Sequence, residues 1–451
     1  MIRYFFLTFI LIIPLSAGLN DLRLQDAIEI LKRSNLELKS AEFDEKMKYY
    51  EAQAVSGMKL GKLDAQMSAM RSNDAGNVFG FKLQSREANF GDFGAGEFDP
   101  SNPDVLTIEP YDLNYPKARN HYLTKLTYSI PLYTSGKIYE YGKIAKKLAL
   151  MSKLDTKKVL QEKIYEVKKT FYDIGLIEEY IKNLSLITRN IKQLEQTVQQ
   201  MKKEGFALES DFLEVQAQGA EAESMFIQAK LNKDLAYQYL SFLLNQDVTS
   251  IVAQENSLAT PKIITKDDVV TSNLDIEKAK MGLEVSKRAV SAQRANFGPS
   301  IGGFAEYGSA DNEVNFDKDK DFYTVGVQLS WNIFNGGSDY ANLERAKVEY
   351  LKTQKQVELA QNGIYLQAKK LQTEILSTKE EIKSYQTQYK FASRVYDTYN
   401  ERYKEGIVPI SDVLIKQSKK LEVMTKLLSV KNKYNTKIFE LDKLLNRGEE
   451  I

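Results

Sequence analysis

Two aspartates in near-identical turns are the residues whose type and spacing most suggest a chemical role. The stretch KEGFALESDFL at 203–213 returns as KEGIVPISDVL at 404–414. Asp211 and Asp412 therefore occupy equivalent positions in two copies of one motif. A carboxylate in the first turn of a helix complements the positive end of the helix dipole. Helix capping is the simpler interpretation of both aspartates, and any further role depends on what the surrounding elements bring together.

No other set of residues forms a catalytic constellation. The chain has one histidine, His121, and no cysteine, which excludes disulfides, thiolate metal sites and thiol catalysis. Without a second histidine to share a metal, we expect His121 to be a surface or interface side chain. The carboxylates of DFGAGEFDPSNPD lack the ordered spacing of an EF-hand, and the glycines there lack the strand-to-helix context of a nucleotide fingerprint. The sequence therefore predicts neither an enzyme nor a cofactor.

The net charge and the N-terminal residues limit the classes of protein to which the chain can belong. The 62 basic and 61 acidic residues nearly cancel, so no net field directs the chain to nucleic acid. Arg3 precedes an apolar run that ends in the small residues Ser16, Ala17 and Gly18. This pattern predicts a signal peptide over 1–18, since the run is shorter than the ~20 residues of a spanning helix. We expect an exported protein.

The chain repeats itself at an offset of 201 residues. Gly136 and Gly205 return as Gly337 and Gly406, and the run LLN at 243–245 returns at 444–446. About 120 residues repeat without a gap. The sequence therefore predicts a tandem duplication, with repeats at 19–245 and 265–451 and a linker at 246–264.

Each repeat contains two long helices. From Leu160 to Met201 apolar residues recur in alternating steps of three and four, which is the spacing of a heptad-like seam. The pattern predicts a helix over 136–204, about 100 Å long, and a returning helix over 210–245. The second repeat predicts the same pair over 337–405 and 410–446. Each repeat is thus expected to form a long antiparallel hairpin.

The repeated turn is the expected tip of each hairpin. Gly205 and Gly406 can adopt the left-handed conformation that ends a helix. Ser210 and Ser411 are candidate N-caps of the returning helices, each followed by its aspartate. The residues that flank the tips are Lys203, Glu204, Lys404 and Glu405.

Ahead of each long helix the period changes to two. In YTVGVQLSWNIF the apolar residues run from Tyr323 through Trp331 to Ile333 at alternate positions, as in a strand with one apolar face. We expect β-hairpins at 60–133, with a long loop at 74–120, and at 300–334. The strand-to-helix junctions are expected at Pro131, Gly136, Gly336 and Gly337.

Four strands cannot close a barrel, which needs roughly eight. A homotrimer with twelve strands would close one in the outer membrane, and its helices would form a hollow cylinder. The fold class expected is an α+β membrane protein, with long helical hairpins and four strands per chain. The alternative is an exported coiled-coil scaffold in the periplasm or at the cell surface that forms no channel.

These elements resemble the TolC family of outer-membrane efflux proteins. The resemblance rests on PLYTSGK and NIFNGGS before the long helices, on the two KEG turns, and on LRLQDAIEILKRSNLELKSAE near the start. It implies a trimer with a β-barrel in the outer membrane and an α-helical tunnel across the periplasm. It also implies docking to a periplasmic adaptor and to an inner-membrane transporter of the RND or ABC type, in a tripartite efflux pump or a type I secretion system.

The resemblance assigns the periplasmic tips to 205–211 and 406–412. In such a trimer Asp211 and Asp412 would each occur three times and form acidic rings that restrict the aperture and favour cations. The chain departs from the family pattern at Glu204 and Glu405, where a small apolar residue is usual, and in its long 74–120 loop. The transported substrate, whether drug, metal ion or protein, is not indicated by the sequence.

Overall fold

The structure is a computed structural model that describes residues 18–252, 259–314 and 318–449. The predicted signal peptide, apart from Gly18, lies outside the described residues. The chain divides into two compact units. The first unit contains residues up to Lys46, Met151–Met281 and residues from Lys355 onward; the second contains Met47–Leu150 and Gly282–Gln354. Each unit therefore draws its segments from both sequence repeats.

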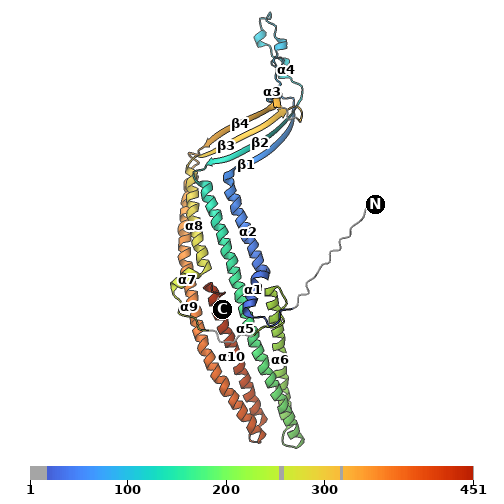
Figure 1. The fold of residues 1–451 in the computed structure, drawn as a ribbon, viewed down its shortest axis with the longest axis vertical. Coiled ribbons are helices and arrows are strands. Elements are labelled where there is room, and N and C mark those ends of the chain that lie inside the picture. Colours follow the sequence, from blue (N-terminus) through green and yellow to red (C-terminus); the bar gives the residue numbers. More distant parts are fainter. Residues whose placement is uncertain (1–17, 253–258, 315–317, 450–451) are drawn as a thin grey trace, which may run out of the picture. The chain divides into compact units, whose positions relative to one another are not determined.

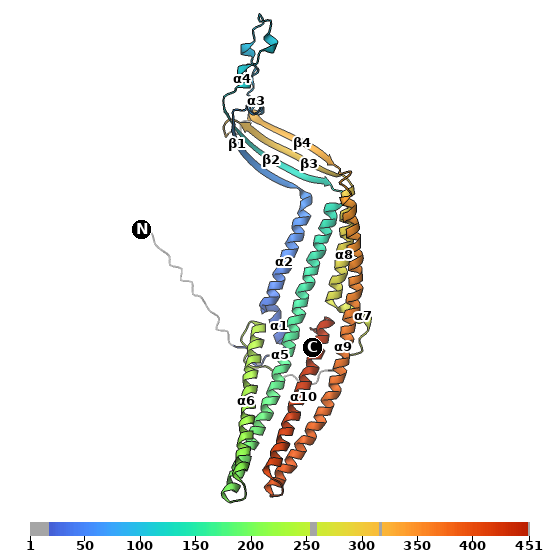
Figure 2. The ribbon, with the colours of Figure 1, turned by 180° about the vertical axis from the view of Figure 1, so that it is seen from behind.

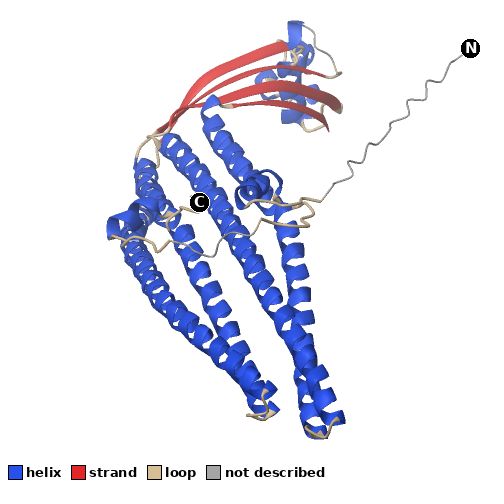
Figure 3. Cartoon of the chain, turned by 60° about the horizontal axis from the view of Figure 1, so that its bottom comes forward, coloured by secondary structure: helices blue, strands red, loops and turns tan. Residues whose placement is uncertain are grey.

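The second unit contains one antiparallel sheet in the order β1-β2-β3-β4 (Figure 1). Its strands are β1 (Lys62–Ser72), β2 (Arg119–Tyr133), β3 (Ser300–Asp311) and β4 (Asp321–Ser330). The two strands of each repeat pair with one another, and β2 also pairs with β3 across the repeats. A bulge lies between Pro131 and Tyr133 of β2. Figure 3 shows the four strands as a curved sheet.

The loop between β1 and β2 contains short helices, which its Gly- and Pro-rich composition did not predict. They are α3 (Ala75–Gln84), α4 (Tyr111–Asn114) and the 3-10 turns Phe90–Phe93, Ala95–Glu97 and Val105–Thr107. Asp74 caps α3, because its side chain accepts the Asn77 amide at 2.9 Å. This segment is therefore a structured excursion with elements of its own.

The long hairpins have the predicted arrangement. Helices α5 (Lys137–Lys203) and α9 (Ser338–Lys404) each have 67 residues, and α6 (Glu209–Leu244) and α10 (Ile410–Leu444) return from them. Figure 2 shows the two hairpins from behind. Among the helices in the described parts of the chain, none has a stretch that is long and apolar enough to cross a membrane.

Two apolar clusters hold the first unit together. One contains Leu31, Phe171, Leu240 and Ile276, all almost fully buried, and the other surrounds the hairpin tips. The seam residues Ile164 and Val198 are fully buried, as expected of positions that recur every three or four residues. The predicted fold class, long helical hairpins with four strands per chain, is confirmed.

A buried asparagine divides the opening helix of each repeat. Asn35 separates α1 (Leu24–Ser34) from α2 (Leu36–Gly57), and Asn273 separates α7 (Lys266–Ser272) from α8 (Leu274–Arg294). The Asn35 amide donates to the Leu243 carbonyl at 2.8 Å, and its oxygen accepts the Leu38 amide at 2.8 Å. Asn273 makes the equivalent bonds, with the Leu444 carbonyl and the Ile276 amide. Each asparagine thus ties the end of a returning helix to the start of its own repeat.

The last predicted strand ends earlier than its alternation suggested. Trp331 and Ile333 lie beyond β4, which stops at Ser330. The Trp331 indole instead donates to the Phe297 carbonyl at 3.1 Å. Alternation of apolar residues continues past the point where the neighbouring strand β3, which begins at Ser300, can still pair.

We expect the substitution Asn35→Ala to destabilise the first unit by about 1 to 3 kcal/mol. The change leaves the Leu243 carbonyl and the Leu38 amide buried without these hydrogen bonds. The measurement is the midpoint of thermal unfolding of the purified protein. Gln199→Ala, at an exposed position of α5, is the matched control, and equal midpoints for the two variants would contradict the role assigned to Asn35.

Candidate functional site

Both hairpin tips end their long helix with the same backbone geometry. Gly205 and Gly406 have φ angles of +82° and +74°. At the first tip Phe206 donates to the Met201 carbonyl, and Gly205 donates to the Lys202 carbonyl; the second tip makes the equivalent pair of bonds. These two bonds define a Schellman motif, which requires a left-handed residue at this position. Because a Cβ added at either glycine would meet no atom within 4 Å, conformation and not space requires glycine here.

The predicted serine N-caps are wrong. Leu208 and Pro409 precede the returning helices, so Ser210 and Ser411 are their second residues and the aspartates are their third. The Asp211 carboxylate accepts the Leu208 backbone amide at 2.9 Å. Pro409 has no amide hydrogen, so Asp412 cannot form the equivalent bond. The two aspartates are equivalent in sequence but differ in the bonds that hold them.

The tips expose apolar side chains between charged ones. Phe206 and Ile407 follow the two glycines and are 76% and 62% exposed. Lys202 forms an ion pair with Glu209 and lies 5.2 Å from the centre of the Phe212 ring. The predicted flanking residues Lys203, Glu204, Lys404 and Glu405 are all exposed.

Tyr403 joins the two tips. Its side chain is 5% exposed, and its hydroxyl donates to the Met201 sulfur at 3.5 Å. Burial raises the pKa of Tyr403, and the negative charge of Asp211 raises it further. The phenol of the second hairpin therefore stays neutral beside the carboxylate of the first. The sequence did not predict this contact.

The sheet has one exposed apolar face. Side chains alternate between the two faces along each strand, and directly paired residues share a face. Leu126 therefore lies on the same face as its partners Ala65 and Tyr307. The large exposed side chains of this face are Leu63, Met67, Leu126, Tyr128, Tyr307, Tyr323, Val325, Val327 and Leu329. An exposed apolar patch that extends over all four strands marks an interaction surface.

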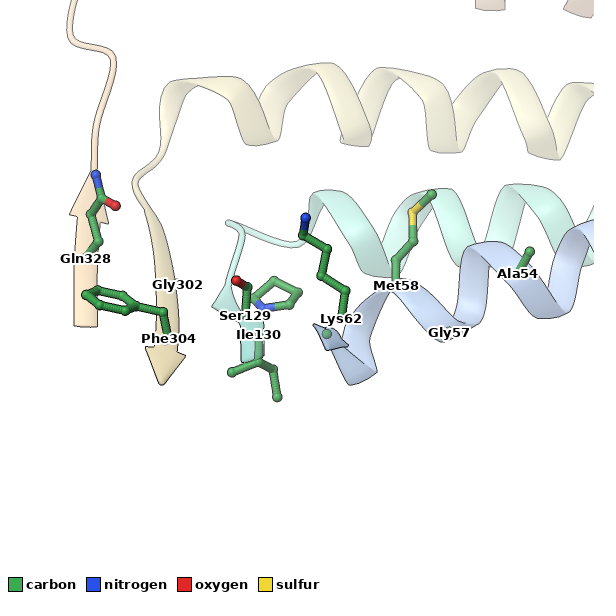
Figure 4. Close-up of a pocket in the computed structure, with 12 residues that line it drawn as sticks. Ala54, Gly57, Met58, Lys62, Ser129, Ile130, Gly302, Phe304 and Gln328 are labelled. Atoms are coloured by element: carbon green, nitrogen blue, oxygen red, sulfur yellow. The ribbon is translucent and has the colours of Figure 1, made fainter. Parts of the chain in front are cut away.

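The opposite face is polar. Lys125 pairs with Glu306 at 3.0 Å, and Lys62 pairs with Asp64 at 2.8 Å. A pocket of about 650 Å³ opens at the end of the sheet where the helices begin, and Figure 4 shows Phe304 and Gln328 lining it from β3 and β4. The Phe304 ring lies directly over Gly326, where a Cβ would approach it to 2.5 Å. The sequence did not predict this pocket.

The three glycines at the strand-to-helix junctions adopt left-handed conformations. Pro131 lies in β2 at the bulge, and Gly136, Gly336 and Gly337 have φ angles of +87°, +69° and +80°. Two helix caps at these junctions were missed. The Thr134 hydroxyl accepts the Ile138 amide at 3.3 Å, and the Asn335 side chain accepts the Asp339 amide at 3.2 Å. Their constant offset of 201 residues is the signal that could have revealed them.

His121 is buried, so the prediction of a surface or interface side chain is wrong. It is 1% exposed and stacks on Phe81 of α3, with ring centres 4.1 Å apart and planes 4° apart. The prediction failed because α3 was not recognised inside the loop. Among the described residues, no group of three or more His, Cys, Asp or Glu side chains could hold a metal ion.

Comparisons with known proteins agree with this architecture. The family model for outer membrane efflux proteins matches residues 267–447. No curated protein sequence matches the chain. Among solved structures, the Campylobacter jejuni CmeC outer membrane channel is similar with a TM-score of 0.77 at 17% identity, covering 94% of this chain and 86% of CmeC.

Two further channel structures are similar over comparable lengths. The open state of the Neisseria gonorrhoeae MtrE outer membrane channel has a TM-score of 0.75 at 17% identity, covering 95% of this chain and 90% of MtrE. CusC, a transmembrane channel protein, has a TM-score of 0.78 at 15% identity, covering 94% and 91%. The second repeat therefore matches the family model for outer membrane efflux proteins, and the fold of nearly the whole chain is similar to that of outer membrane channels.

Proposed function

We propose that this chain is one subunit of a homotrimeric exit duct. The duct conducts substrates passively through the outer membrane, and its helical hairpins form a tunnel across the periplasm. The observation that carries the proposal is the division of the four-stranded sheet into an exposed apolar face and a polar face. Hydrocarbon would solvate the first face, and a water-filled lumen would solvate the second.

The strand count and the helix surfaces support a trimer. Four strands leave two unpaired edges, and three copies supply the twelve strands that a closed barrel can use. The long helices also expose apolar side chains at steps of three, four, seven or eight residues, which keep them on one face of a helix. They are Ile227, Leu231, Leu235 and Phe242 on α6 and Val348, Leu351, Leu359 and Leu366 on α9. Neighbouring copies of the chain would cover these stripes.

The hairpin tips suit docking to other proteins. Phe206 and Ile407 present apolar side chains next to exposed charges at equivalent points of the two hairpins. A periplasmic adaptor that recognises one tip could therefore recognise the other. We infer that the duct works with such an adaptor and an inner-membrane transporter of the RND or ABC type, in a tripartite pump or type I secretion system.

The experiment that tests the duct is planar-bilayer conductance of the detergent-extracted protein, with its gel migration measured before and after heating. A trimer that dissociates on heating and gives small, discrete, cation-selective steps is expected. A water-soluble monomer that never inserts would overturn the proposal and would favour a scaffold with two capped hairpins.

The substitution Val325→Lys should prevent insertion into the outer membrane. Val325 is 72% exposed on the apolar face, and a lysine in the middle of a lipid-facing strand costs roughly 2 to 4 kcal/mol. Thr324→Lys is the matched control, because the neighbouring residue lies on the polar face beside Glu306. The measurement is the amount of heat-dissociable trimer in outer-membrane fractions. Equal amounts for both variants would contradict the assignment of the faces.

Substitutions of the two tip aspartates should distinguish a role in helix capping from a role in ion selectivity. Asp412→Asn should lower cation selectivity with little change in tip stability, because no bond to residue 409 is lost. Asp211→Asn should lower selectivity and also destabilise the tip by about 0.5 to 2 kcal/mol, since it weakens the bond to Leu208. Reversal potentials measure selectivity, and hydrogen exchange of the tip amides measures stability. Unchanged selectivity in both variants would count against acidic rings at the aperture.

A further inference from the structure

Helix α3 covers the polar face of the sheet at the end away from the helices. Phe81 of α3 stacks on His121, which shares its face with Lys125 and Thr127 of the same strand. Val78 of α3 is 2% exposed, and Ala310 on β3, which α3 contacts, is fully buried. Figure 1 shows α3 at this end of the strands and α4 farther out. The face that would line the lumen is therefore occupied here by a segment of the long loop.

The three residues that follow α3 fasten it to both β-hairpins. Arg86 adopts a left-handed φ of +55°, and its guanidinium donates to the carbonyls of Asp319 and Asp321, the latter at 2.6 Å. The Glu87 carboxylate accepts from Arg119 of β2 and from Lys320, which precedes β4, at 2.5 Å. We call Arg86, Glu87, Arg119 and Lys320 the clasp.

The clasp links the first repeat to the second. Lys320 also donates to Asp311 at 2.7 Å, and the Asp311 side chain is 4% exposed. Arg119 donates to the buried Ser85 hydroxyl at 2.9 Å. Charge-assisted hydrogen bonds of this kind are about twice as strong as neutral ones. They hold α3 against the sheet although much of the loop beyond it is exposed, including Phe90 and Leu106.

We propose that α3 is a lid at the outer mouth of the duct, held closed by the clasp and by the Phe81–His121 stack, and released by acidification of the medium. This proposal rests on the proposed function, because only a closed barrel gives the polar face a lumen. A helix with its side chains is about 10 Å across, so three copies of α3 on the inner wall would narrow the mouth.

The setting of His121 makes the stack sensitive to protons. Neither ring nitrogen has a hydrogen-bond partner, and the side chain is almost fully buried. The charged groups on the surrounding elements are Arg119 on β2, Lys82 on α3, its ion-pair partner Asp92, Glu87 after α3, Asp311 on β3 and Lys320 before β4. A protonated imidazole would be a buried charge without an acceptor and close to the Arg119 guanidinium, which is unfavourable. Because histidine gains a proton near pH 6.5 in water, mild acid favours the released lid.

The clasp opens at lower pH than the stack. Burial would raise the pKa of Glu87, but the hydrogen bonds from Lys320 and Arg119 outweigh it and lower that pKa below its ordinary value. A lowered carboxyl pKa stabilises the closed lid at neutral pH, and this contribution is lost as the pH falls through the lowered value. Acid therefore weakens both attachments, and the histidine responds first.

The first test is hydrogen exchange of the α3 amides in the full-length, detergent-extracted protein at about pH 7.5 and about pH 5. After correction for the intrinsic rate, protection of α3 should fall at the lower pH in the unmodified chain. His121→Phe is the matched control, because it keeps an aromatic ring against Phe81 and cannot gain a proton, so its protection should persist. Glu87→Gln should reduce protection at neutral pH by about tenfold, as expected for weakened hydrogen bonds between charged groups. Equal protection at both pH values in the unmodified chain would overturn the proton-sensitive lid.

Single-channel conductance of the same samples tests the lid as a constriction. Conductance should rise at the lower pH in the unmodified chain and stay constant in His121→Phe. Release of α3 without any change in conductance would overturn the constriction. Failure of every sample to form pores would overturn the proposed duct, and with it the proposal that α3 covers a lumen. Hydrogen exchange would still decide whether protons release α3.

Discussion

The apolar seam of the long helices is the constraint on which the rest of the first unit depends. A helix of 67 residues has little stability in water unless one face is covered along its length. Residues such as Ile164, Phe171 and Val198 recur at steps of three or four and are buried by the returning helices. The seam continues to Val198, which is close to the first tip. The buried side chains of the seam therefore fix the end of the helix that leads into the turn at Gly205. Precise geometry at the tips is thus a consequence of burial far along the helices.

The sheet follows a different constraint, because its two faces differ in polarity. Apolar side chains such as Val325 and Leu329 remain exposed on one face, and ion pairs such as Lys125–Glu306 lie on the other. A single chain leaves the apolar face exposed and can pair neither outer edge. This division leaves an isolated subunit with a large apolar surface. In the trimer that we propose, it would separate lipid from a water-filled lumen. In the duct that we propose, association and conduction would therefore share one structural cause.

The sequence predicted the features that depend on local pattern. Heptad spacing gave the long helices, two-residue alternation gave the strands, and the repeated glycines gave the tips. The serine caps were wrong because the returning helices begin at Glu209 and Ile410, directly after Leu208 and Pro409, which places the aspartate at the third position. His121 was misplaced because its cover, Phe81, lies 40 residues away in a loop without any period. Asn35 gave no signal, because a polar residue between two amphipathic helices looks like any solvated position.

The difference between the two tips has a mechanical consequence. At the first tip, the Asp211 carboxylate accepts a hydrogen bond from the backbone amide of Leu208, the residue before the returning helix. At the second tip, Pro409 stiffens the backbone and has no amide hydrogen to donate to Asp412. In the trimer that we propose, six tips of two kinds would alternate around the axis. An equal force on all six tips would displace the two kinds of tip by different distances, since they differ in stiffness. The end of the tunnel would then widen with threefold and not sixfold symmetry.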